Sequence, residues 1–246
     1  MQAVQQTISV AQGSANCSSR LWFLISFYAV VLVLSNWFDL RLIKIFGLVA
    51  NSGTPIFALT FFLANLITEI YGYKYARLAI WWGFSFNLFV FVYGQLVILM
   101  PSLDHYHTEI FDTLLKANNR AIVAGLLGYL CSEPLNSFVM AKLKIEFRGQ
   151  FMGGRFLLST LIASVADSVV FGFIAFYGIF DQKVLISMIF GVMIVKMTIY
   201  FLALPFFLHF AKKLKQKEHM DIYDKGTKFN FFRLDTHYAP TANQFK

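Results

Sequence analysis

The chain has 246 residues, of which 58% are hydrophobic and 14% charged, with a mean hydropathy of +0.61 and a formal net charge of +8. Soluble domains average about 45–50% apolar and about 25% charged residues, so this composition excludes an ordinary soluble domain and indicates a membrane protein. The two cysteines, Cys17 and Cys131, are far apart in the sequence and predict neither a disulfide framework nor a zinc site.

Six long apolar stretches predict six membrane-spanning helices in an all-α bundle, because about 20 apolar residues cross ~30 Å of hydrocarbon. The first stretch is too long for the apolar region of a signal peptide, and no small-residue cleavage site follows it. We therefore expect a polar segment at 1–20, a transmembrane domain at 21–210 and a basic tail at 211–246. The predicted spans are 21–39, 55–72, 78–100, 120–141, 156–180 and 184–210.

Lysine and arginine residues are distributed unequally between the two sides that these spans define. Of 21 such residues, 15 fall on the side of both termini and 5 on the other, while Lys196 lies inside a span. The positive-inside rule therefore predicts that both termini are cytoplasmic. The tail is interpreted as a topology signal without a nucleic-acid partner. Binding of nucleic acid or of anionic lipid headgroups is the alternative for it.

Three ionisable residues, Glu133, Asp167 and Lys196, fall near the middle of the last three spans. Each charge at the bilayer centre costs roughly 2.5–3.5 kcal/mol on insertion scales, so we expect these residues to share a polar pocket inside the bundle. Asn136 shares a helical face with Glu133, and Ser168 follows Asp167. We expect Asp167 to pair with Lys196 and the remaining acid to carry a proton in the empty state. An ion pair with only a structural role is the alternative.

Two further polar positions, Asn65 and Glu69, share one face of the second span, and Asn36 lies near the outer end of the first. Glu69 lies near the cytoplasmic end of its span, where water, Lys74 or Arg77 are its expected partners. Asn36 is the weaker signal, because interhelical hydrogen bonds in membranes average only ~0.6 kcal/mol. The candidate substrate-binding residues are therefore Glu133, Asn136, Asp167, Ser168, Lys196, Asn36, Asn65 and Glu69.

Enzyme signatures are absent from the sequence, which has no zinc-protease motif, no nucleophile turn and no phosphate-binding loop. We therefore expect no catalytic residues, no cofactor and no metal site, and we interpret His105 and His107 as part of a hydrated loop. The only aspartates in the predicted spans are Asp39, at an outer end, and Asp167, which disfavours an intramembrane aspartate protease. Active transport would have to draw on an ion gradient or on a separate ATPase subunit.

Two stretches are more specific than generic membrane sequence. The first reads TFFLANLITEIYGYKYAR at 60–77, preceded by Ser35-Asn36. The second reads SEPLNS at 132–137 and is followed by Ala141-Lys-Leu-Lys144, Arg155, Ser159-Thr160, Asp167-Ser168 and Ile174-Ala-Phe-Tyr-Gly178. Over about residues 30–210, these motifs resemble the queuosine precursor transporter family (the VUT family) of bacterial six-span inner-membrane proteins.

The resemblance implies import of a 7-deazaguanine precursor, typified by 7-cyano-7-deazaguanine, for salvage into tRNA queuosine. The guanine-like edge of such a base presents two adjacent donors, which the carboxylate of Glu133 or Asp167 would accept. Asn136 suits the neighbouring acceptors, because an amide both donates and accepts. By resemblance, the residues at family motif positions are Asn36, Glu69, Arg77, Glu133, Asn136, Asp167, Ser168 and Lys196.

The sequence departs from the family pattern at Asn65, where an aspartate is common, and at Ala163-Ser164, where a Gly-Gln pair often precedes the aspartate. The family is also distantly similar to substrate-binding subunits of energy-coupling-factor transporters. The alternative function is therefore a substrate-binding subunit that needs a separate ATPase module. The expected partners are a deazapurine base and the lipid bilayer, with a homodimer left open.

Overall fold

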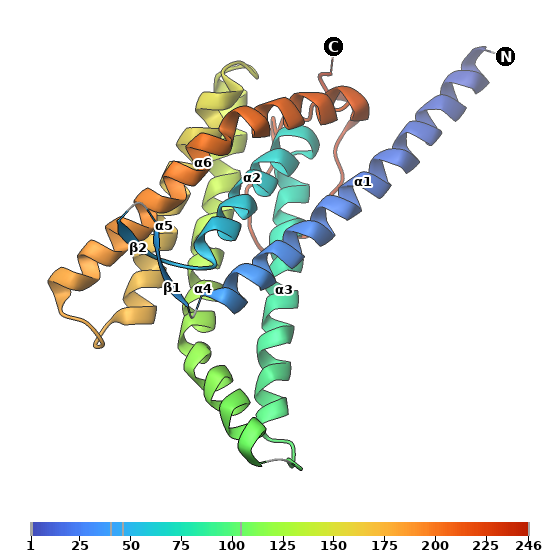
Figure 1. The fold of residues 1–246 in the computed structure, drawn as a ribbon. Coiled ribbons are helices and arrows are strands. Elements are labelled where there is room, and N and C mark those ends of the chain that lie inside the picture. The colour runs from blue at the N-terminus through green and yellow to red at the C-terminus, as the bar shows by residue number, and fades with distance from the viewer. Residues whose placement is uncertain (1, 40, 46, 104, 246) are drawn as a thin grey trace.

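The structure, a computed structural model, describes residues 2–39, 41–45, 47–103 and 105–245 (Figure 1). Six helices in these ranges are long and apolar enough to cross a membrane, so the expected all-α, six-span architecture is confirmed. Two short strands and a 3-10 helix complete the described chain. The elements are α1 (Gln2–Phe38), β1 (Leu42–Ile45), β2 (Leu48–Asn51), α2 (Thr54–Tyr71), α3 (Tyr73–Ile98), α4 (His105–Glu146), α5 (Met152–Phe176), α6 (Gln182–Glu218) and η1 (Pro240–Ala242).

The helices alternate in direction, so the bundle has two ends. The basic end is where α2, α4 and α6 finish, and both chain termini lie toward it at the top of Figure 1. The opposite end carries the two strands and the loops between α3 and α4 and between α5 and α6.

Several helices are longer than the predicted spans. The last one was expected to end at residue 210 but continues to Glu218, because Lys, Gln and Glu are good helix formers and extend it past the apolar run. It ends where His219 adopts the left-handed conformation (φ 51°) that commonly terminates helices. Similarly, α4 begins at His105, so His105 and His107 belong to a helix and the expectation of a loop there is wrong. The side chains of these two histidines lie outside the described part of the chain.

Helix α2 lies at the centre of the bundle and contacts α1, α3, α4, α5 and α6. Most of it is buried, including the ring of Phe62, which stacks on Phe207 of α6 with 3.9 Å between ring centroids. Small residues on the surrounding helices let polar groups into the interfaces. A Cβ atom at Gly125 of α4 would lie 2.5 Å from the side-chain oxygen of Asn36 of α1, so only glycine permits this approach.

The two strands between α1 and α2 form an antiparallel hairpin in which Leu42 is opposite Asn51 and Ile43 is opposite Ala50. Ala50 is buried against Val192 and Val195 of α6. The hairpin therefore covers part of the bundle at the opposite end.

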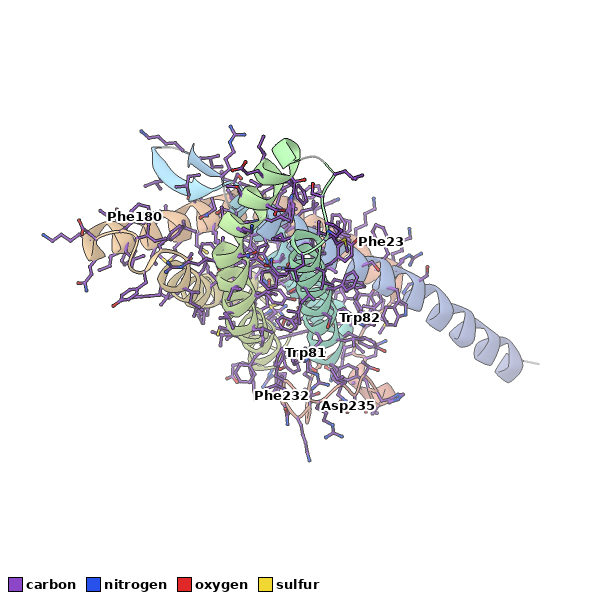
Figure 2. The ribbon with its side chains drawn as sticks, turned by 90° about the horizontal axis from the view of Figure 1, so that it is seen from below. Phe23, Trp81, Trp82, Phe180, Phe232 and Asp235 are labelled. Atoms are coloured by element: carbon purple, nitrogen blue, oxygen red, sulfur yellow. The ribbon has the colours of Figure 1, made fainter. Side chains whose placement is uncertain are left out.

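The segment after α6 folds back over the basic end. The backbone N–H of Ile222 donates to the carbonyl oxygen of Ile70 at 3.2 Å, and the indole N–H of Trp81 donates to that of Phe231 at 3.0 Å. Figure 2 shows Phe232 beside Trp81 at this edge of the molecule. This packing joins the C-terminal tail to α2 and α3.

Candidate substrate-binding site

A buried ion pair joins α5 and α6 near the middle of the bundle. The ammonium group of Lys196 donates to a carboxylate oxygen of Asp167, and both side chains are nearly completely buried. The same ammonium group lies 4.5 Å from the ring centroid of Phe57, which adds a cation–π contact. The predicted pairing of Asp167 with Lys196 is confirmed.

A small cavity lies beside this pair, towards the opposite end of the bundle. Its polar lining residues are Asn36, Asp39, Asn51, Thr54, Asp167 and Lys196. The cavity has a volume of about 10 Å³, which is room for about one water molecule. Admission of a bicyclic base would therefore require the surrounding helices to separate.

Asp39 also lines this small cavity. From the sequence it was identified only as an aspartate at the outer end of a span, not as a candidate site residue. It is buried, and its backbone oxygen accepts a hydrogen bond from the amide of Asn51 at 2.7 Å. Burial raises the pKa of Asp39 to about 7, while nearby Lys196 acts to lower it and Asp167 acts to raise it. The signal that could have identified it is its spacing of three residues from Asn36, which places both on one helical face.

Glu133 and Asn136 form a second polar layer on α4. Both residues are fully buried, and neither carboxyl oxygen of Glu133 has a hydrogen-bond partner among the described residues. Thr60, Asn136 and Tyr28 are close enough to interact with this carboxyl group, although none makes a hydrogen bond of normal geometry to it. Such unsatisfied buried groups are costly, and a polar ligand would satisfy them.

The amide of Asn136 also has spare hydrogen-bonding capacity. Its nitrogen makes one long bond, 3.4 Å, to the carbonyl oxygen of Phe61, and its oxygen has no partner among the described residues. The hydroxyl group of Tyr28 is similarly buried without a partner in this part of the chain. Sequence reasoning missed Tyr28, because a tyrosine in an apolar span is usually an interfacial anchor.

The two polar layers lie at different depths. Asp167 contacts α4 at Gly128, where a Cβ atom would lie 3.0 Å from its carboxylate. Glu133 is five residues further along α4, or about 8 Å nearer the basic end at 1.5 Å per residue. On α5, the hydroxyl groups of Ser164 and Ser168 are buried and have no partner among the described residues. The polar groups thus extend over two levels of the bundle.

The side chains of the candidates Asn36 and Asn65 differ in their hydrogen bonding. Both amide atoms of Asn36 are buried without a described partner, so Asn36 retains hydrogen-bonding capacity. The amide of Asn65, by contrast, donates to the hydroxyl groups of Thr160 and Tyr200 at 3.0 Å and accepts from that of Ser159 at 3.1 Å. Asn65 therefore links α2 to α5 and α6 in this conformation.

Glu69 lies in a charged network at the basic end. Its carboxylate accepts two hydrogen bonds from Arg155, at 2.7 and 3.2 Å, and pairs with Lys215 at 3.0 Å. The expectation that Lys74 or Arg77 would be its partner is wrong, because the tail supplies the acceptors for those two side chains. Sequence spacing alone favoured the near bases, whereas its actual partners lie 86 and 146 residues away.

The network continues into the tail and closes the basic end. Asp221 pairs with Lys144 at 2.7 Å and with Lys215 at 2.8 Å, and Lys144 also donates to the backbone oxygens of Glu69 and Ile222. Among the described residues, no group of three or more His, Cys, Asp or Glu side chains is arranged to hold a metal ion.

Two comparisons with known proteins match this chain. A family model described as putative vitamin uptake transporter matches residues 51–210. The chain is also 26% identical over 188 residues to the probable queuosine precursor transporter of Bacillus subtilis strain 168, a match that covers 74% of this chain and 80% of that relative. No solved structure matches the chain. With six apolar helices around buried polar groups, the chain is a multi-pass membrane protein and belongs to this family of uptake transporters.

Proposed function

We propose that this transporter imports a 7-deazaguanine precursor of queuosine, such as 7-cyano-7-deazaguanine, for salvage into tRNA. The observation that carries the proposal is the carboxyl group of Glu133, which is fully buried and has no hydrogen-bond partner among the described residues. The relative named as a probable queuosine precursor transporter supports the same substrate class.

The edge of a guanine-like base matches this group chemically. Its ring N1–H and its exocyclic amine are adjacent donors, and the two oxygens of Glu133 would accept one bond each. Asn136 would donate to the neighbouring carbonyl oxygen of the base in place of its long bond to Phe61. Bonds to an ionised acceptor are the stronger kind, so a base without the amine would be rejected.

Charge balance supports coupling of uptake to protons. Asp167 and Lys196 neutralise each other, which would leave an ionised Glu133 as a buried charge without a partner. Burial of an unpaired charge is costly, so Glu133 would hold a proton until the donors of the substrate replace it. Exchange of that proton in each cycle would couple import to the proton gradient. Uptake that a protonophore leaves unchanged would remove this part of the proposal.

The arrangement of the two ends supports alternating access. The small cavity lined by Asp39 lies between the Glu133 layer and the opposite end of the bundle. The charged network of Glu69, Arg155 and Lys215 lies between the Glu133 layer and the basic end. Substrate would enter from the opposite end and leave when the bonds among Glu69, Arg155 and Lys215 break.

The test uses a host that cannot make the precursor. This host would receive the gene and micromolar precursor, and the queuosine content of its tRNA would be measured. We expect Glu133→Gln to lower uptake about 10- to 100-fold, because hydrogen bonds to charged groups contribute about 1.5–3 kcal/mol and 1.4 kcal/mol is a factor of ten. Glu146→Gln is the matched control, since Glu146 is exposed on the same helix.

Each outcome of this test is informative. If the wild-type chain yields no more queuosine than an empty vector, the proposed substrate is wrong. If Glu133→Gln transports like the wild type at equal abundance, Glu133 does not read the base and Asp167 becomes the candidate. Uptake by the purified chain alone in liposomes would exclude the alternative of a binding subunit that requires an ATPase module.

A further inference from the structure

The charged residues of the C-terminal tail are segregated by sign. Its buried or partly buried acidic side chains bind the helical bundle, whereas the bases Lys225, Lys228 and Arg233 are exposed. The contacts of the acids are Asp221 with Lys144 and Lys215, Asp224 with the backbone N–H of Tyr73, and Asp235 with Lys74 and Arg77.

The bases of the tail surround a cavity at the basic end of the structure. The cavity has a volume of about 410 Å³ and is lined by the cations Lys74, Lys225, Lys228 and Arg233 and by the single carboxylate Asp235. Sites for small ligands typically occupy about 300–1,000 Å³. The cavity thus has the size of a ligand site and an excess of positive charge.

Two of these cations are available to a ligand. Lys225 and Lys228 are exposed and have no carboxylate partner among the described residues. The carboxylate of Asp235 is already engaged by Lys74 and Arg77, whose hydrogen bonds outweigh the effect of burial and hold its pKa below the usual value. An anion in the cavity would therefore meet unpaired cations.

Apolar side chains adjoin the cationic cavity, and the start of the apolar run of α3 after Arg77 indicates that they lie near the membrane surface. Phe232 and Leu234 are 79% and 60% exposed on either side of Arg233, and Phe231 stacks on Trp81 with 4.9 Å between ring centroids. Trp81 comes four residues after Arg77, the last charged residue of α3. Exposed phenylalanine and leucine beside bases at this depth are typical of segments that insert into the boundary between headgroups and acyl chains.

We propose that the tail cavity binds the phosphate group of an anionic phospholipid in the adjoining leaflet, while Phe232 and Leu234 lie among the acyl chains. The phosphate would accept hydrogen bonds from Lys225 and Lys228, and also from the guanidinium group of Arg233, whose Nε atom lies 3.5 Å from Asp235. A soluble phosphate ester shares this anionic chemistry but would not use the apolar residues. Because Asp221 of the same tail pairs with Lys144 and Lys215, a lipid that holds the tail would also stabilise the closed basic end.

The test measures lipid binding by the purified full chain in a neutral detergent. Phosphatidylglycerol, phosphatidylcholine and inorganic phosphate would be added separately, with thermal unfolding and native mass spectrometry as readouts. We expect phosphatidylglycerol alone to raise the unfolding temperature and to remain bound. The variant Lys225→Gln/Lys228→Gln/Arg233→Gln should bind it at least tenfold more weakly.

The matched control removes the same number of charges elsewhere. Lys44→Gln/Lys183→Gln/Lys212→Gln replaces three exposed lysines outside the cavity, and it should respond to phosphatidylglycerol like the wild type. Equal responses of the two triple variants would overturn the proposal. If the first triple variant does not fold, Lys225→Gln/Lys228→Gln replaces only the two unpaired lysines.

A separate variant distinguishes a lipid from a soluble phosphate. Phe232→Ser should weaken binding of phosphatidylglycerol while leaving the cationic cavity intact. Stabilisation by inorganic phosphate that equals the effect of the lipid would overturn the assignment to a phospholipid.

Discussion

Replacing Lys196 alone should destabilise the protein more than replacing Lys196 and Asp167 together. Lys196→Met leaves Asp167 as a buried carboxylate without its cation, and breaking a buried ion pair in this way typically costs about 3–5 kcal/mol. The change also removes the cation–π contact with Phe57, a loss that the double variant shares. We therefore expect Lys196→Met to lower the free energy of unfolding by about 4 kcal/mol.

The double variant Asp167→Asn/Lys196→Met leaves no unpaired charge. Replacement of a buried ion pair by neutral groups is often close to neutral, so we expect a cost of about 1–2 kcal/mol. If Asp167→Asn alone costs about 3 kcal/mol, the coupling energy between the two positions is about 5–6 kcal/mol. Recovery of stability does not imply recovery of transport.

The assay is reversible denaturation of the four purified proteins in one detergent. Lys116 and Asp112 provide a control pair, because their charged groups are 3.6 Å apart on a surface where Lys116 is 60% exposed, and such pairs contribute about 0–1 kcal/mol. If the loss of unfolding free energy in the double variant equals the sum of the losses in Lys196→Met and Asp167→Asn, the inference that the two residues neutralise each other is refuted.

Three further predictions concern other parts of the molecule. Because the pKa of Asp39 is about 7 against an ordinary 3.8, the folded state holds this proton more tightly than the unfolded state, so the stability it contributes is lost as pH rises from about 4 through 7. Thermal unfolding of Asp39→Asn should vary less with pH over this range, and equal slopes would contradict the assignment. At the basic end, Arg155→Met should cost about 3–5 kcal/mol and Lys215→Met less, since Lys215 is partly exposed; denaturation that ranks them in reverse would contradict the network described. Finally, a reporter active only in the cytoplasm should be active when inserted near Arg148 and silent near Leu103, as the distribution of basic residues predicts.

The number of spans and the central ion pair were predictable from the sequence. Both follow from the free-energy cost of placing apolar segments in water or charged groups in the bilayer. An apolar run of sufficient length must cross the bilayer, and a charge inside such a run must find a partner. Only one cation, Lys196, lies near the middle of a span, so its pairing with an acid had few alternatives.

The partners of Glu69 and the packing of the tail were not predictable in the same way. Bases close to Glu69 in the sequence, such as Lys74, are as plausible partners for it as Arg155 and Lys215. Only the packing of α2 against α5 and α6 decides which bases pair with Glu69. Likewise, the contact of Trp81 with Phe231 joins residues 150 positions apart, with no periodic pattern in the tail to indicate it. Asp39 was not predicted as a site residue, because its burial depends on the helices that pack around it.

The central position of α2 has a consequence for the order in which the chain assembles in the membrane. This helix is synthesised second, but the groups that satisfy Asn65 and Glu69 follow later, with Tyr200 135 residues after Asn65 and Lys215 146 residues after Glu69. At about 5–20 residues per second, synthesis of the 146 residues from Glu69 to Lys215 takes about 7 to 30 s. During this interval α2 would expose an amide and a carboxylate to lipid if it were already inserted alone. Its stable insertion therefore depends on water, on a helper protein or on the arrival of α5 and α6.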